Sequence, residues 1–220
     1  ETKNNIIRKE ASLKNTEYSV TNNVKEAVLK LNEIAIYMRK ERMKNGAISF
    51  DKKEVRFSIN KEKEPTGVYV KESKESNKLV EEFMLLANRK VSEYIGKRNK
   101  KNLFIYRVHD LPDESKIKAL KEVAKSLGYN LDISSRRRMS ESLNKMIKQI
   151  KGKKEQSLIE SLAIRSMSKA EYTTKNIGHY GLSFEYYSHF TSPIRRYPDV
   201  IVHRLLEKYL NKENPSGHES

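Results

Sequence analysis

Apolar side chains recur at three- and four-residue steps in several blocks of this chain, and this spacing is the strongest constraint on its fold. The clearest block runs from Val24 to Arg42, with Lys and Glu between the apolar positions. This is the pattern of an amphipathic helix. The same spacing predicts further helices over 76–95, 112–127, 143–150, 157–170 and 193–210. The chain is therefore expected to be rich in helices.

Shorter segments favour strands. Residues 47–50, and then the alternating Val55, Phe57 and Ile59, predict two short strands joined by a polar turn, and 67–71 and 103–108 predict two more. The chain has no internal repeat and no Gly/Ser-rich linker, which favours one helix-rich α+β domain with a small antiparallel sheet. Its expected extent is 24–210, between a lead-in at 1–23 and a tail at 211–220.

The charge balance points to an anionic partner. The 220 residues include 45 Lys and Arg against 29 Asp and Glu, a net charge of +16. Such a field attracts polyanions, of which nucleic acid is the commonest, while the alternative is charge that serves only solubility. The chain has no cysteine, which excludes disulfides and Cys-ligated metals. No apolar run has the length of a membrane helix, so we expect a soluble, cytoplasmic protein without a membrane partner.

Common catalytic motifs are missing from the sequence. It contains no phosphate-binding G-x-x-x-x-G-K-[ST] loop, no G-x-S-x-G elbow and no H-E-x-x-H pair. No two of the five histidines stand four residues apart, and the carboxylates are scattered among lysines. Two divalent cations would need several carboxylates close together. We therefore predict no metal site in this chain. Glu82 is unusual because it lies beside an apolar stripe, where an unpaired carboxylate would be costly.

The densest unusual stretch, 176–204, combines arginines, histidines and aromatic residues with a Ser-Pro turn. At its centre, Thr191 and Ser192 are residue types that often cap the N-terminus of a helix, and Pro193 suits a first helical turn. Two arginines follow, Arg195 and Arg196. A helix that begins here would present backbone N–H groups together with both guanidinium groups, which suits a phosphate. The alternative is a capped helix whose arginines pair with Glu185 or Asp199.

The segment HFTSPIRRYPDVIVHRLL, at 189–206, resembles the signature of the ribonuclease II/ribonuclease R family of processive 3′-to-5′ exoribonucleases. Four more segments resemble the family's other blocks in the family's order: KNGAISFDKKEVRF at 44–57, LVEEFMLLANRKVSEYI at 79–95, LFIYRVHDLPD at 103–113 and AEYTTKNIGHYGL at 170–182. The resemblance covers 24–210, and the blocks are most similar to the bacterial ribonuclease R branch. It implies the fold of that family's catalytic domain, known as the RNB domain.

The resemblance also implies an activity and a site. In the family, single-stranded RNA is hydrolysed from its 3′ end to nucleoside 5′-monophosphates with two Mg²⁺ ions held by aspartates. By position, Arg195 matches the arginine on the scissile phosphate, and Arg196, Ser192 and Thr191 are expected to support the RNA backbone or orient Arg195. Phe50 matches the phenylalanine that stacks on a base, with core packing as the alternative. Glu82 matches a glutamate near a ribose 2′-OH.

The most serious departure of the chain from the family concerns the metal site. The metal-binding motif D-x-x-x-x-x-D-x-D-D, which in the family precedes the G-A-I-x-F block, does not occur in it. We therefore expect the C-terminal portion of a catalytic domain, incomplete at both ends and inactive alone. Its partners would be RNA, the rest of that domain with its magnesium ligands, and flanking oligonucleotide-binding barrels. The alternatives are a non-catalytic RNA-binding module of the same fold and a basic protein that binds ribosomal RNA or anionic membrane non-specifically.

Overall fold

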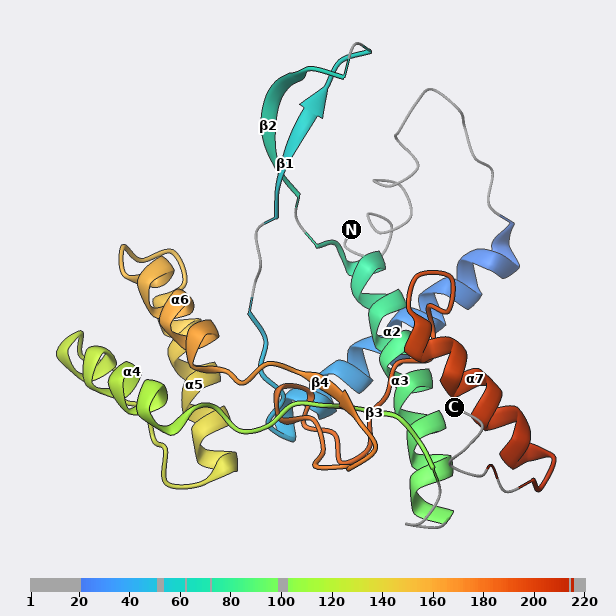
Figure 1. Ribbon diagram of the computed structural model, residues 1–220. Helices are drawn as coiled ribbons and strands as arrows, with labels where there is room; N and C mark the ends of the chain where they lie inside the picture. The colour runs from blue at the N-terminus through green and yellow to red at the C-terminus, as the bar shows by residue number, and fades with distance from the viewer. Residues whose placement is uncertain are drawn as a thin grey trace. The chain divides into compact units, whose positions relative to one another are not determined.

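The computed structural model describes residues 21–50, 54–61, 63–71, 73–98, 103–213 and 215 (Figure 1). Its helices are α2 (Asn22–Lys44), α3 (Glu75–Arg98), α4 (Glu114–Ser126), α5 (Arg136–Ile150), α6 (Gln156–Ser166) and α7 (Tyr197–Leu210), with a 3₁₀ turn at Tyr180–Leu182. Its strands, β1 (Glu54–Ile59), β2 (Pro65–Lys71), β3 (Tyr106–Val108) and β4 (Glu171–Thr173), form two antiparallel pairs. The predicted helix-rich fold with little antiparallel sheet is confirmed.

Backbone contacts divide the chain into two compact units. The first comprises residues 1–40 and 51–83, and the second comprises 41–50 and 84–220. In the first unit, Arg39 of α2 donates to the Glu75 carboxylate at the start of α3 over 2.9 Å, and Lys78 donates to the same carboxylate over 2.9 Å. The Arg39–Glu75 pair links the two helices, and the Lys78–Glu75 pair lies within α3. No helix in the described ranges has both the length and the apolar composition that crossing a membrane requires.

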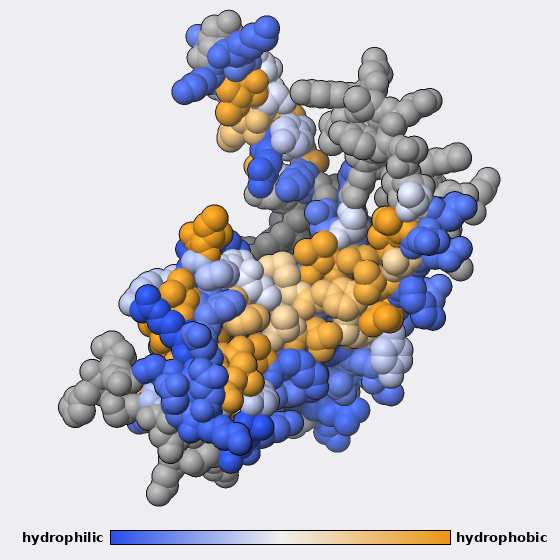
Figure 2. Space-filling view, turned by 90° about the vertical axis from the view of Figure 1, so that its right-hand side faces the viewer, coloured by the Kyte–Doolittle hydropathy of each residue, from blue (hydrophilic) through white to orange (hydrophobic). Residues whose placement is uncertain are grey.

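The β1–β2 hairpin of the first unit has an exposed apolar face. Cross-strand partners place Val55 opposite Val70 and Phe57 opposite Val68, so these four side chains share one side. Each of them is about half exposed or more, and Figure 2 shows apolar atoms of the hairpin at the top of the view. The alternating pattern thus predicted the strand correctly, but the side that it forms is not buried within this chain. A two-stranded hairpin is marginal without a packing partner.

We expect this face to cause self-association. Phe57→Lys should lower the weight-average mass at high concentration because it places a charge in the middle of the apolar face. Sedimentation velocity over a concentration series measures the effect. Ser58→Lys adds the same charge on the other side of β1 and should leave association unchanged. Equal effects of the two variants would show that net charge, and not this face, controls association.

The second unit has two main apolar clusters. In the first, α4, α5 and α6 pack together, as Figure 1 shows, around buried side chains that include Ile117, Leu120, Leu143, Met146, Ile159 and Ala163. In the second, the end of α3, strand β3 and α7 share Ile95, Phe104, Tyr106, Val108, Val202, Leu205 and Tyr209. Ser188 Oγ donates to the Ile105 carbonyl over 2.5 Å, which joins the segment before α7 to the chain beside β3.

Several predicted boundaries are wrong for physical reasons. Residues 47–50 form no strand; the Ile48 N–H donates instead to the Gly181 carbonyl over 2.9 Å. Helix α6 buries Ile159 and Ala163 and exposes Leu158 and Ile164, two of the apolar residues whose spacing predicted the helix over 157–170. When a short helix has apolar residues on several sides, its packing partners determine which side is buried.

Gly96 does not end α3, contrary to the prediction; the helix continues to Arg98. A Cβ atom on Gly96 would lie 2.6 Å from a Tyr186 ring carbon and 2.7 Å from the Tyr106 hydroxyl. Glycine is thus required here for close packing, not for a turn.

Gly96→Ala is expected to destabilise the fold by about 1–3 kcal/mol through overpacking, although alanine in a helix usually gains about 1 kcal/mol over glycine. Urea unfolding measures the change. A Cβ on Gly67 meets no atom within 4 Å, so Gly67→Ala is the matched control and should not destabilise. A stabilised Gly96→Ala variant would contradict this packing argument.

Candidate functional site

Helix α7 begins at Tyr197 and not at Pro193. Its N-cap residue is Arg196, and the Ser192 carbonyl accepts the N–H groups of Arg195 at 3.3 Å and Arg196 at 3.2 Å in a turn before the helix. The prediction that Thr191 and Ser192 cap a helix at Pro193 is therefore wrong. In such a helix residue 198 would have to donate its N–H to residue 194, and Pro198 has none. We call residues 190–196 the arginine loop.

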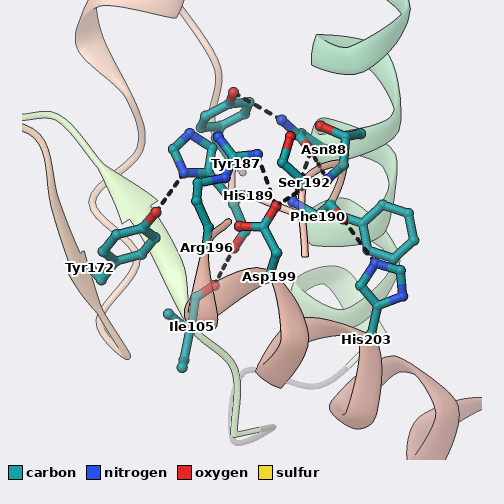
Figure 3. A network of polar contacts seen from close by, with 12 residues as sticks. Asn88, Ile105, Tyr172, Tyr187, His189, Phe190, Ser192, Arg196, Asp199 and His203 are labelled. Carbon is teal, nitrogen blue, oxygen red and sulfur yellow. Dashed lines mark hydrogen bonds and ion pairs between the residues drawn. The ribbon is translucent and has the colours of Figure 1, made fainter. Parts of the chain in front are cut away.

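The arginine loop is pinned by two buried side chains. The Asn88 Oδ1 atom of α3 accepts the N–H groups of Phe190 at 2.9 Å and Thr191 at 3.2 Å. The Asp199 Oδ2 atom of α7 accepts the next N–H group, that of Ser192, at 2.8 Å. Figure 3 shows these contacts. Asn88 is 3% exposed and Asp199 0%, so three successive backbone donors are satisfied away from water.

The two arginines have different surroundings. The Arg196 Nη2 atom lies 2.8 Å from Asp199 Oδ2, and its side chain is only 18% exposed, so Arg196 forms the ion pair that the alternative interpretation anticipated. The Arg195 side chain is exposed and has no hydrogen-bond or ion-pair partner among the described residues. It has two exposed apolar neighbours in the chain, Ile194 at 97% and Tyr197 at 68%. A free, exposed guanidinium suits a phosphate, and an exposed tyrosine ring offers a base a stacking surface.

Histidine and tyrosine rings form a chain behind the loop. Ring centroids lie 5.0 Å apart for His109 and His179, 5.2 Å for His179 and Tyr187, and 5.7 Å for Tyr187 and His189. The Tyr172 hydroxyl lies 2.6 Å from His189 Nδ1. Each of these three histidines therefore has an aromatic neighbour. The row of rings is a packed structural element rather than a set of metal ligands.

Burial keeps these histidines neutral. It lowers the pKa of His179 to about 3, with the nearby His109 and Arg107 acting in the same direction. Burial also lowers the pKa of His189 to about 4, assisted by the charge of Arg196. His109 likewise has a lowered pKa from burial; its Nδ1 atom accepts the Gly181 N–H over 2.9 Å, as a neutral ring does.

The described residues do not fit a divalent cation. Across the ranges that the structure describes, no three His, Asp or Glu side chains gather where they could hold one. The buried Asp199 has one carboxylate oxygen without a partner, but its other oxygen is 2.8 Å from a guanidinium, whose charge opposes a cation.

The remaining predicted site residues lie elsewhere in the fold. Phe50, in the second unit, is partly buried against the α4–α6 cluster, so it takes part in the packing that was the alternative to base stacking. Glu82 belongs to the first unit, on α3, and is 4% exposed. A separate groove of about 820 Å³ in the second unit is lined by Arg136, Lys175 and Tyr186 among others, and includes none of the predicted site residues.

Sequence reasoning missed Asn88 and the histidine–tyrosine chain. One local signal for Asn88 exists: it is an amide in the apolar run LLAN, at a helix position that faces the interior, where a polar group needs partners. Its partners, however, are about 100 residues further along the chain, and no local sequence pattern predicts them.

The chain is similar to known ribonucleases. Residues 1–212 match the family model described as the RNB domain. Ribonuclease R of Aquifex aeolicus is 39% identical over 176 residues, which are 80% of this chain and 24% of that protein. DIS3-like exonuclease 2 of Schizosaccharomyces pombe is 40% identical over 202 residues, which are 87% of this chain and 21% of that protein. The chain thus spans about a quarter of the length of these relatives.

Solved structures agree on the fold. Ribonuclease R of Mycoplasma genitalium, in complex with ribose-methylated single-stranded RNA, has a TM-score of 0.80 and 23% identity over 93% of this chain and 32% of its own. Yeast Ssd1, described as a pseudonuclease, has a TM-score of 0.56 and 26% identity over 64% of this chain and 18% of its own. From the family match and the shared fold, the chain belongs to the RNB domain family of ribonuclease II and ribonuclease R.

Proposed function

We propose that this chain supplies the RNA-contacting part of a ribonuclease catalytic domain that degrades single-stranded RNA. The observation that carries the proposal is the exposed, unpaired Arg195 on a loop pinned by Asn88 and Asp199, within a chain of the RNB family. A guanidinium held in this way can bind a phosphate through two parallel N–H donors without first leaving another partner. The net charge of +16 favours the approach of the polyanion.

The finer activity that we propose is processive hydrolysis from the 3′ end, with release of nucleoside 5′-monophosphates. Arg195 would contact the scissile phosphate and stabilise the negative charge that develops there. Arg196, with Ser192 and Thr191, would keep the loop in place. Phe50 would stack on a base through the part of its ring that the core leaves uncovered, and Glu82 would accept a hydrogen bond from a ribose 2′-OH.

Magnesium is proposed to act in the whole enzyme with ligands that are not among these 220 residues. Bound there, it would supply Lewis acidity and an activated water. The residues of this chain would bind and orient RNA and neutralise phosphate charge. The partners that we propose are RNA, the segment with the aspartate ligands and the oligonucleotide-binding barrels.

A non-catalytic RNA-binding module is the second candidate. The likeness to yeast Ssd1, described as a pseudonuclease, favours it, since a chain can share this fold without being a nuclease. Both candidates require RNA binding through Arg195. They differ only in whether a metal site joins this chain.

The test is RNA binding and turnover by this chain. Arg195→Ala should weaken binding of a single-stranded RNA about 10- to 100-fold, the loss expected for a charge-assisted hydrogen bond to phosphate. Arg165→Ala, which removes the same charge from an exposed position on α6, should change the affinity much less. Fluorescence anisotropy at fixed salt measures both. Equal losses would show that binding depends on net charge alone.

Turnover is measured with labelled RNA and Mg²⁺. The chain alone should leave the RNA intact, since the residues described here do not fit a metal site. Mononucleotide release that Arg195→Ala abolishes would overturn the proposal that the metal ligands lie outside this chain. If the chain binds RNA but a complete enzyme that contains it also leaves RNA intact, the binding module is the correct function.

A further inference from the structure

We propose that Asn88 is a positioning residue for Arg195, an inference that rests on the proposed RNA contact. Asn88 does not belong to the arginine loop and is too buried to touch RNA. Its Oδ1 atom accepts two neighbouring N–H groups of the loop, and its Nδ2 atom donates to the Tyr187 hydroxyl over 3.1 Å. The two loop donors require the oxygen of the amide, which leaves its NH₂ group facing the Tyr187 hydroxyl.

The contact reaches Arg195 through a series of backbone constraints along the arginine loop. Asn88 holds the N–H groups of Phe190 and Thr191, and Asp199 holds that of Ser192. Pro193 follows, with a fixed φ and no N–H group to satisfy. The Ser192 carbonyl then accepts the Arg195 N–H. Within 190–195, Ile194 is thus the one residue for which no such constraint is observed.

This arrangement separates positioning from contact. The side chains that hold the loop are buried and carry no charge toward solvent except through the Asp199–Arg196 pair. The side chain that meets solvent, Arg195, has no restraint of its own among the described residues. Its placement is therefore inherited from the backbone, and a loop that loses the Asn88 acceptor would present Arg195 over a wider range of positions.

Two variants of Asn88 separate the acceptor from the side-chain volume. Asn88→Leu keeps the volume but leaves the N–H groups of Phe190 and Thr191 without an acceptor. Asn88→Asp keeps the acceptor oxygen, and the Tyr187 hydroxyl can donate to the other oxygen. Amide hydrogen exchange in the absence of RNA reports directly on the hydrogen bonds from the loop to Asn88. Exchange at Phe190 and Thr191 should speed up in Asn88→Leu and stay slow in Asn88→Asp.

A double-mutant cycle with Arg195→Ala distinguishes positioning of Arg195 from a general structural role, because only positioning makes the effect of Asn88→Leu on RNA affinity depend on Arg195. Asn88→Leu should weaken single-stranded RNA binding about tenfold when Arg195 is present and less than about twofold in the Arg195→Ala background, because the two changes remove the same contact. Asn88→Asp should recover most of the affinity. An equal loss from Asn88→Leu in both backgrounds would overturn the proposal.

The proposal can still be tested if Asn88→Leu does not fold or if the chain does not bind RNA. If Asn88→Leu does not fold, Tyr187→Phe removes the hydroxyl that accepts from Asn88 Nδ2 and so loosens the amide. It should give faster exchange at Phe190 and Thr191 and weaker RNA binding that again requires Arg195. Unchanged exchange and binding in Tyr187→Phe would then overturn the proposal. If the wild-type chain does not bind RNA, the proposed function fails, and amide exchange alone decides whether Asn88 holds the loop.

Discussion

Replacing Asp199 by alanine is expected to lower the free energy of unfolding by about 3–5 kcal/mol, the range for breaking a buried ion pair by removing one partner. The substitution leaves the Arg196 guanidinium, which is only 18% exposed, without its carboxylate. It also leaves the Ser192 N–H without an acceptor. Chemical denaturation with urea, followed by circular dichroism, measures the loss.

Two comparisons show where the loss arises. Asp199→Asn keeps an acceptor for the Ser192 N–H and removes only the charge, so it should cost less than Asp199→Ala. Glu185→Ala removes a carboxylate from an exposed position and should change stability by no more than about 0.5 kcal/mol. A loss below about 1 kcal/mol for Asp199→Ala would contradict the importance of this buried pair.

Acid is expected to destabilise the second unit well above the pH at which carboxylates titrate. The ordinary histidine pKa of 6.5 applies to the unfolded chain, whereas the pKa is about 3 for His179 and about 4 for His189 in the fold. Below pH 6.5 the unfolded chain therefore binds protons that the folded chain does not. The stability is complete above pH 6.5 and is lost as the pH falls toward the folded values, by up to about 1.4 kcal/mol per pH unit for each histidine.

The measurement is the free energy of unfolding at intervals between pH 6.5 and 5, where most carboxylates remain ionised in both states. His179→Gln retains an acceptor for the Leu182 N–H, which His179 Nδ1 accepts at 3.3 Å, but cannot be protonated. It should therefore reduce the slope of stability against pH. A flat profile in the wild-type chain would show that these rings accept protons without leaving their packed positions.

The parts of the fold that the sequence predicts are those set by local periodicity. The helix expected over 24–42 is present as α2, and the apolar spacing of Leu143, Met146 and Ile150 corresponds to the buried face of α5. These predictions succeed because a repeat near 3.6 residues makes burial of one face favourable in almost any surroundings. The position of Arg195 in the chain was also identifiable, since its motif is continuous.

The parts that could not be predicted depend on contacts between distant segments. Gly96 looks like a helix stop until the rings of Tyr106 and Tyr186 are placed against it. The letters RR do not show that Arg195 and Arg196 differ. The difference depends on where α7 begins and on the pairing of Arg196 with Asp199 within its first turn. The exposed hairpin face alternates just as a buried one would.

The same distances along the chain determine when the candidate site can form. Asn88 and Phe190, which share a hydrogen bond, are 102 residues apart, and Tyr209, whose hydroxyl donates to the Leu103 carbonyl over 2.8 Å, is 106 residues from it. Such contacts must wait for closure of a long loop, which is slow compared with helix formation. During synthesis, α4, α5 and α6 can pack together before α7 is made, because their shared apolar cluster includes no residue of α7. The arginine loop acquires its pinned conformation later, once Asp199 of α7 is in place to accept the Ser192 N–H, so the proposed RNA contact of Arg195 would form late in folding.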